Sequence, residues 1–251
     1  MRATTILAAA AAIAVFVVAC NRGGGSPPSP PPPPPPAGVR VVDMIPASLS
    51  GETWQDAEPF LTIYASNPRF LAASAFTPNP GGPTSTTAPI YVSDDSGNSW
   101  SLRNTLPSNV QTADITHAPG EPPELYATIL SAPSIALKEL ETSDLFSVTT
   151  MRQDATRPNA DQPFVRAVRA ATADRIYVGI NDFDAPNGRT ATVDISLNGG
   201  ATFTSRRIEP RTTLGQNGPS IRPAPARDNT VYVAYFGWRS AAGNTITSDV
   251  V

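Results

Sequence analysis

The chain has little cysteine and histidine, and each shortage excludes a kind of protein. Cys20 is the only cysteine and His117 the only histidine among 251 residues. No disulfide can therefore form within the chain, and no histidine-rich metal site can be built. We predict no metal site and no cofactor, and we expect stability to come from a packed core rather than from covalent links.

Charged side chains are also scarce, at 16% of the sequence, and neither sign dominates. The 18 Lys and Arg residues face 21 Asp and Glu residues, which gives a formal net charge of −3. No stripe of basic residues is present, although a protein that binds the phosphate backbone normally needs one. We therefore predict no nucleic-acid partner.

The N-terminus, in contrast, has the pattern of an export signal. A positive start is followed by an apolar stretch from Ile6 to Val18 and by small residues just before Cys20. The stretch is shorter than the ~18 to 20 residues that a spanning helix needs. The pattern resembles a bacterial lipobox, which implies that residues 1–19 are removed and that Cys20 is acylated. A plain secretory signal with an incidental cysteine is the alternative.

Residues 20–37 are expected to form a spacer. The run from Pro27 to Pro36 is interrupted only by Ser29, so it favours an extended polyproline II rod that cannot enter a core. A proline-rich ligand for a partner domain is the alternative. We expect a protein anchored by lipid in a bacterial cell envelope, and Asn21 after the cysteine favours the outer membrane or cell surface.

The remaining residues, 38–251, contain a repeat of about 50 residues. Four apolar, strand-like runs begin at Leu71, Leu125, Ile176 and Val231, and each follows a turn. Repeats of this length, with four short strands each, are typical of β-propeller blades. A short helical turn is conceivable only near residues 134–139, where the repeat pattern favours a strand.

A turn motif recurs within these repeats. Residues 93–100 and 196–203 both read S-x-[DN]-x-G-x-[ST]-[WF], and each follows a strand-like run. The Asp or Asn caps its own backbone, the Gly permits a positive φ, and the aromatic residue packs the turn onto its neighbour. The motif residues are Ser93, Asp95, Gly97, Ser99 and Trp100, followed by Ser196, Asn198, Gly200, Thr202 and Phe203.

This motif resembles the Asp-box, or BNR, repeat of sialidase-like β-propellers. The resemblance implies an all-β propeller of four-stranded blades, with three complete blades and a truncated fourth in this chain. The second unit is degenerate and keeps only Asp144. The chain stops where its next motif should begin, so we expect a fragment of a longer protein. A short open propeller that is completed by oligomerisation is the alternative.

The resemblance also implies what a sialidase site needs: an arginine cluster, an acid/base and a Tyr-Glu pair. The aromatic-Arg-Ile-Pro motif that carries the first arginine has no match here. Counting from the prolines before two inner strands places Arg166 and Arg222 at the same offset, so their guanidinium groups are expected to converge on one anionic group. The candidate ligand-binding residues are Arg166, Arg222, Asp161, Gln162 and Gln216.

Other candidates are weaker. The stretch 182–188 has carboxylates at a spacing that a Ca²⁺ loop can use, but a hairpin turn explains it better. A catalytic triad would have to depend on His117. Trp54 or Trp238 can stack on a sugar ring, although packing within a blade is the commoner role.

We therefore expect a lipid-anchored, envelope-exposed propeller that binds a glycan or a protein partner without catalysis. The rival is an exo-sialidase-type glycoside hydrolase whose catalytic residues lie partly in missing blades. A scaffold for a large assembly is a third hypothesis, and it predicts a broad surface patch rather than a pocket.

Overall fold

The computed structural model divides the chain into two compact units, Met1–Val41 and Val42–Val251, and the second holds the fold. Four sequence-based candidates, Cys20, the proline run, Trp54 and Gln216, lie outside the described residues. The structure describes residues 38–45, 57–76, 87–107, 114–131, 136–142, 144–147, 152–184, 190–209, 221–226 and 228–251.

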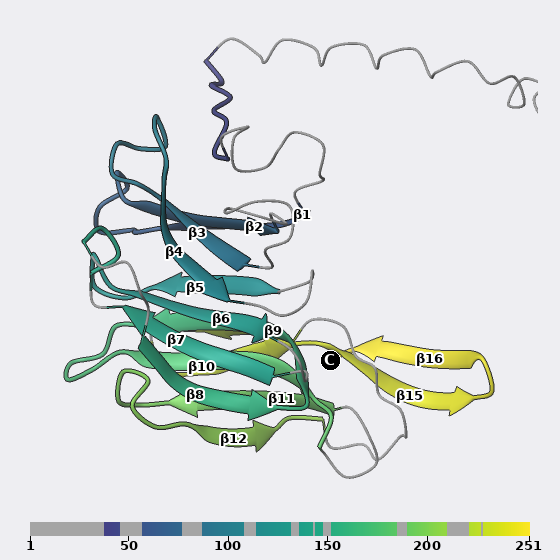
Figure 1. Cartoon of the computed structure of the whole chain (residues 1–251). Coiled ribbons are helices and arrows are strands. Elements are labelled where there is room, and N and C mark those ends of the chain that lie inside the picture. Colours follow the sequence, from purple (N-terminus) through teal and green to yellow (C-terminus); the bar gives the residue numbers. More distant parts are fainter. Residues whose placement is uncertain are drawn as a thin grey trace, which may run out of the picture. The chain divides into compact units, whose positions relative to one another are not determined.

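Every regular element in these ranges is a β-strand, and most strands form three four-stranded antiparallel sheets in chain order (Figure 1). The first sheet contains β1 (Ala57–Ile63), β2 (Leu71–Phe76), β3 (Thr87–Ser93) and β4 (Ser101–Pro107). The second contains β5 (Ile115–Pro119), β6 (Leu125–Ser131), β7 (Ala136–Thr142) and β8 (Arg152–Pro158). The third contains β9 (Ala160–Val168), β10 (Arg175–Asp182), β11 (Thr190–Ser196) and β12 (Thr204–Arg207).

The predicted apolar runs are confirmed as the second strands β2, β6 and β10, and the strand expected after residue 134 is confirmed as β7. None of the described residues forms a helix with the length and hydropathy to cross a membrane.

The last part of the chain differs from the predicted fourth unit. It forms two two-stranded sheets, β13 (Arg222–Pro225) with β14 (Val231–Ala234), and β15 (Phe236–Ala242) with β16 (Thr245–Val250). β16 pairs with β15, because the chain continues past Tyr235 and turns back at Gly243.

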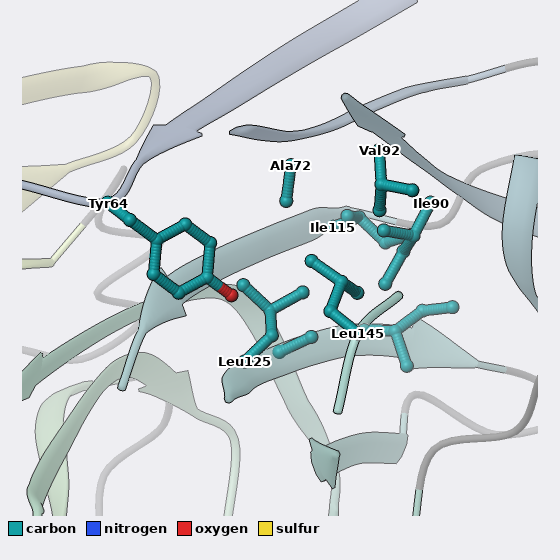
Figure 2. Packing of buried hydrophobic residues seen from close by; sticks show 9 residues of the cluster. Tyr64, Ala72, Ile90, Val92, Ile115, Leu125 and Leu145 are labelled. Atoms are coloured by element: carbon teal, nitrogen blue, oxygen red, sulfur yellow. The ribbon is translucent and has the colours of Figure 1, made fainter. Parts of the chain in front are cut away.

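The core lies between successive sheets rather than inside any one of them. One cluster joins Ala72, Ile90 and Val92 of the first sheet to Ile115 and Leu125 of the second (Figure 2). A second cluster joins the second sheet to the third, and a third joins the third sheet to β13 and β14. Because apolar surface is buried on both faces, β10 reads as a continuous apolar run rather than an alternating one.

Hydrogen bonds from threonine side chains hold the first strands of neighbouring sheets together. The Thr62 hydroxyl in β1 donates to the backbone oxygen of His117 in β5, at 2.9 Å. Thr116 in β5 donates to the backbone oxygen of Pro163 in β9, at 3.2 Å, and accepts from the N–H of Val165, at 3.0 Å. Among the strands that the structure describes, neighbouring sheets have no backbone hydrogen bonds between them. The threonine side chains instead link β1, β5 and β9, which lie side by side.

Gly179 allows β13 to approach the third sheet. A Cβ atom at Gly179 would lie 2.3 Å from the backbone oxygen of Ile221, closer than any real contact. Glycine is therefore required in the middle of β10, where it lets another backbone pass. The same approach brings Arg222, the residue after Ile221, to the inner strands.

The two predicted turns share one hydrogen-bond pattern. The Ser93 hydroxyl accepts from the N–H of Gly97 at 2.8 Å, and the Asp95 carboxylate accepts from the N–H and hydroxyl of Ser99, at 2.9 and 2.6 Å. Gly97 has a φ of 79°, which an L side chain rarely adopts. The turn between β11 and β12 repeats the pattern with Ser196, Asn198, Gly200 and Thr202.

The aromatic residue at the end of each turn packs on a buried cluster. Trp100 contacts the cluster of Ala75 and Tyr91, and Phe203 contacts the one between the second and third sheets. In the second sheet, the Asp144 carboxylate accepts from the N–H groups of Phe146 and Ser147 at 3.0 and 3.2 Å. The degenerate unit therefore keeps part of the turn chemistry.

Replacing Thr116 with Val should lower the free energy of unfolding by about 1–3 kcal/mol, because the buried N–H of Val165 loses its acceptor while the side-chain volume is kept. Chemical denaturation measures the change. Thr204→Val, at an exposed position of β12, is the matched control. Equal stability of the Thr116 variant and the wild type would show that this link is dispensable.

Replacing Asp95 with Asn should lower the melting temperature at pH 6 but not near pH 2. The hydrogen bonds from Ser99 and Ser93 hold the pKa of Asp95 at about 2, so the stabilisation is present above the unfolded pKa of about 3.9 and is lost as pH falls towards 2. Thermal unfolding across this range measures the difference, with Asp94→Asn as the control. A difference that stays constant with pH would contradict the account.

Candidate functional site

A cavity of about 350 Å³ lies where the first strands of the sheets meet. Its walls come from β1, from the start of β5, from β9 and from β13. They combine two carboxyl groups, one amide, one guanidinium and two phenyl rings. The lining residues are Glu58, Pro59, Phe60, Asp114, Ile115, Thr116, Gln162, Pro163, Phe164 and Arg222.

These residues occupy matching positions of the repeat. In each sheet, one lining residue of the first strand pairs with the fourth residue of the apolar run in the second strand. These lining residues are Phe60, Thr116, Phe164 and Arg222. Three more lie two residues earlier, at Glu58, Asp114 and Gln162. The residues at both positions line the cavity. The repeat therefore brings equivalent positions of successive sheets to one cavity, and the residue type differs from one sheet to the next.

Two of these positions have an unusual backbone. Glu58 and Gln162 have φ values of 51° and 52°, in the left-handed region, and each precedes a proline. In both strands the pairing register shifts beside this residue, as in a β-bulge. Bulges redirect side chains, and strained residues of this kind gather at functional sites. At Gln162 the bulge turns the backbone N–H towards Asp114, where it donates a hydrogen bond.

The carboxyl groups of Glu58 and Asp114 hydrogen-bond to each other across the cavity. Such a bond requires one proton between the two groups. Burial, followed by the hydrogen bond and the charge of Glu58, raises the pKa of Asp114 to about 7, while the N–H of Gln162 and the charge of Arg222 oppose this shift. Asp114 therefore gains or loses its proton close to neutral pH.

Both candidate arginines stack on one aromatic ring. The guanidinium carbon of Arg222 lies 4.0 Å from the ring centroid of Phe164, and that of Arg166 lies 4.4 Å from the same centroid. The two charges are thus no farther apart than the sum of these distances. Burial lowers the pKa of Arg222, and the charge of Arg166 lowers it further. Phe164 supplies a cation–π surface that stabilises the two cations side by side.

His117 lies behind this ring system and does not line the cavity. Its Nδ1 atom is 2.7 Å from the hydroxyl of Thr62, and its ring meets that of Phe60 edge to face at 4.8 Å. Complete burial lowers the pKa of His117 to about 3, so the imidazole is neutral. These contacts give His117 a packing role rather than a place in a triad.

The sequence-based candidates divide into three groups. Arg222 and Gln162 line the cavity, and Arg166 lies beside it on Phe164. Asp161 lies in β9 but is not a lining residue. Gln216 lies outside the described residues.

The predicted equivalence of the two arginines is wrong. Strand pairing places Arg222 at the repeat position of Phe164, and Ala224 at that of Arg166. Counting from the prolines failed because Pro163 directly precedes Phe164, whereas Pro219 comes three residues before Arg222 in the sequence. A shift of two residues keeps a side chain on the same face, and both arginines still reach the same ring.

The remaining candidates have other contacts. Asp182 ends β10 and binds Arg157 at 2.9 Å, and Asp184 accepts from the side-chain amide of Asn159 at 2.8 Å, so both carboxylates at the start of stretch 182–188 have protein partners. Trp238 lies in β15 and not in the cavity wall. Within the described ranges, no cluster of three or more His, Cys, Asp or Glu side chains is arranged to hold a metal ion.

Sequence reasoning missed Glu58, Asp114 and Phe164 as site residues. The signal was present for two sheets, because Glu58-Pro59-Phe60 and Gln162-Pro163-Phe164 share one pattern. Asp114 has no proline after it, so only its place ahead of the apolar run of the second sheet could have identified it.

No protein-family model matches the chain, and no curated protein matches it. Solved structures do. The α-L-arabinanase of Penicillium chrysogenum complexed with arabinobiose is 14% identical, with a TM-score of 0.56. The GH93 α-L-arabinofuranosidase of Fusarium graminearum with arabinobiose is 12% identical, with a TM-score of 0.53. Each match covers 82% of this chain and 64% of the other.

A Hadza microbial sialidase is also similar, at 13% identity over 77% of this chain and 43% of that one, but its TM-score of 0.43 is too low to carry an argument. The two stronger matches are β-propellers, and they show that fold for this chain. The chain spans less than two thirds of their length.

Replacing Glu58 with Gln should lower the pKa of Asp114 below 7, because the negative charge beside it is removed. The ¹³Cγ chemical shift of Asp114, followed by NMR as a function of pH, measures this pKa. Glu121→Gln, at an exposed position, is the control. An unchanged pKa in the Glu58 variant would show that the two carboxyl groups are not coupled.

Proposed function

We propose that this chain is a glycan-binding β-propeller that holds its ligand in the cavity between the first strands without cleaving it. The observation that carries the proposal is the composition of the cavity wall. Carboxyl, amide and guanidinium groups match the many donors and acceptors of a sugar, and the rings of Phe60 and Phe164 offer apolar surface to its C–H groups.

The arrangement of the two acids supports binding rather than hydrolysis. Glycosidases usually hold their two carboxyl groups about 5–5.5 Å apart for retention or about 6.5–9.5 Å apart for inversion. Glu58 acts on Asp114 as a hydrogen-bond partner, which places the two carboxyl groups closer together than either of these separations.

A glycoside hydrolase, of the exo-sialidase type described under Sequence analysis, is the second candidate. What favours it is that the solved structures of similar fold are named as an arabinanase and an arabinofuranosidase. On this hypothesis the catalytic residues would lie partly beyond the segment that matches them.

Within the binding hypothesis, Arg222 and Arg166 recognise an acidic group of the glycan and Gln162 contributes its amide. Asp161 and Gln216 are proposed as polar partners near these groups. The two turns of shared hydrogen-bond pattern are proposed as Asp-box repeats, with a role in the fold only. No residue of either turn is among those that line the cavity, which supports that separation.

We further propose that lipid on Cys20 attaches the protein to a bacterial envelope, at the outer membrane or cell surface. The support is the sequence pattern before Cys20 and the proline-rich run after it. Such an anchor would present the cavity to glycans outside the cell, and a protein partner that carries the glycan is compatible with it.

On a glycan array that includes neutral and acidic oligosaccharides, the detergent-solubilised full chain should bind at least one class. Arg222→Ala should weaken that binding about 10- to 100-fold, the effect of losing a charge-assisted hydrogen bond. Arg206→Ala, an exposed arginine of β12, should not. Products should be sought by mass spectrometry, because shortening of the bound glycan would establish the hydrolase instead.

A further inference from the structure

We propose that Asp114 competes with an acidic glycan for Arg222, so that binding of the glycan draws a proton onto the Glu58–Asp114 pair. The inference rests on the proposed glycan binding and adds the ligand class and the residue that controls its recognition. Asp114 would then be a specificity-determining residue that does not itself bind the acidic group.

Three strands place the competing groups in one cavity. Asp114 stands directly before β5, Glu58 lies in β1 and Arg222 begins β13, and all three line the cavity. The guanidinium carbon of Arg222 lies 4.0 Å from the ring centroid of Phe164, and Arg222 lines the cavity, where an anion can reach it. An internal carboxylate and an external one therefore compete for the same cation.

Every charged group near Asp114 takes part in this balance. Glu58 faces Asp114 from β1, and Arg222 faces it from β13. The N–H of Gln162, in β9, donates a hydrogen bond to Asp114. The charge of Arg166 acts on Arg222, and both guanidinium groups lie against the ring of Phe164. With one proton on the acid pair, the pair carries one negative charge and the arginines carry two positive charges. Without that proton, the two carboxylates neutralise both arginines, and nothing remains to attract an anion.

Asp114 gains or loses its proton near neutral pH, so its competition with a ligand carboxylate for Arg222 can be measured. Burial raises the pKa of Asp114 to about 7, whereas Arg222 lowers it. When a ligand carboxylate takes Arg222, this lowering is offset and the new negative charge raises the pKa of Asp114 further. The carboxylate then takes a proton from solvent. No covalent bond changes, and the ligand remains ionised.

The sign of the pH dependence follows. Below pH 7 Asp114 is already protonated, so an acidic glycan binds without proton exchange. Above pH 7 each binding event must bring one proton, and the affinity should fall up to about tenfold per pH unit. A neutral glycan that uses the same cavity gains nothing from the proton and should show no such decline.

Isothermal titration calorimetry of the full chain with trigalacturonic acid, compared with its fully methyl-esterified form, tests the proposal. Titrations at pH 5.5, 7.0 and 8.5, each in two buffers of different ionisation enthalpy, count the protons exchanged. We expect uptake near zero at pH 5.5 and close to one proton at pH 8.5 for the acid. Weaker binding, or none, is expected for the ester.

Two variants make the test specific. Asp114→Asn, which can still donate a hydrogen bond to Glu58, should bind the acid with an affinity that no longer depends on pH and exchange no proton. Asp94→Asn, an exposed change in the turn after β3, should behave as the wild type. Circular dichroism of both variants confirms that they are folded.

The outcomes separate this inference from the proposed function. Binding of the acid with no proton uptake, or equal binding of acid and ester, would overturn the inference and leave glycan binding in place. Proton uptake that persists in Asp114→Asn would assign the coupling to another group and also overturn it. Failure of both sugars, together with failure of every glycan on the array, would overturn both.

Discussion

The arrangement of this protein depends on a small set of hydrogen bonds between first strands. Neighbouring sheets share no backbone ladder, so their relative positions depend on apolar packing and on threonine hydroxyls that reach the next backbone. Thr62 links β1 to β5, and Thr116 links β5 to β9 with two bonds. Apolar packing alone is non-directional. The threonine hydroxyls fix the position of one sheet relative to the next. They therefore also fix the positions of the residues that line the cavity.

The cavity shows how a repeat produces a site without repeating its chemistry. One position holds Phe60, Thr116, Phe164 and Arg222, and the position two residues earlier holds Glu58, Asp114 and Gln162. Two phenyl rings, two carboxyl groups, an amide and a guanidinium therefore line one cavity. Glu58 and Gln162, which precede prolines, have left-handed backbone conformations. Each lies at a β-bulge, and a bulge redirects the side chain of a strand residue, here towards the cavity.

Sequence reasoning reached the second strands and the turns because both depend on local patterns. Apolar runs and the Ser-Asp-Gly-Ser spacing predict structure within a few residues, as the bonds around Asp95 show. The partnership of Glu58 with Asp114 could not be read in this way. It joins two strands more than fifty residues apart, and only the stacking of sheets brings them together. Sequence reasoning did not identify β15 either, which comes just after β14 and pairs with β16.

Opposing charges in a partly buried space make the cavity responsive to its surroundings. An acid pair that shares a proton and two arginines on one ring leave the site close to a balance that a ligand can shift. In the proposed function, this charge balance serves the recognition of an acidic glycan. A crystal structure of the full chain grown with trigalacturonic acid at pH 5.5 tests that claim most directly. The account predicts a sugar between Phe60 and Phe164, with its carboxylate on Arg222. Sugar density elsewhere on the surface, with the cavity filled only by water, would contradict it.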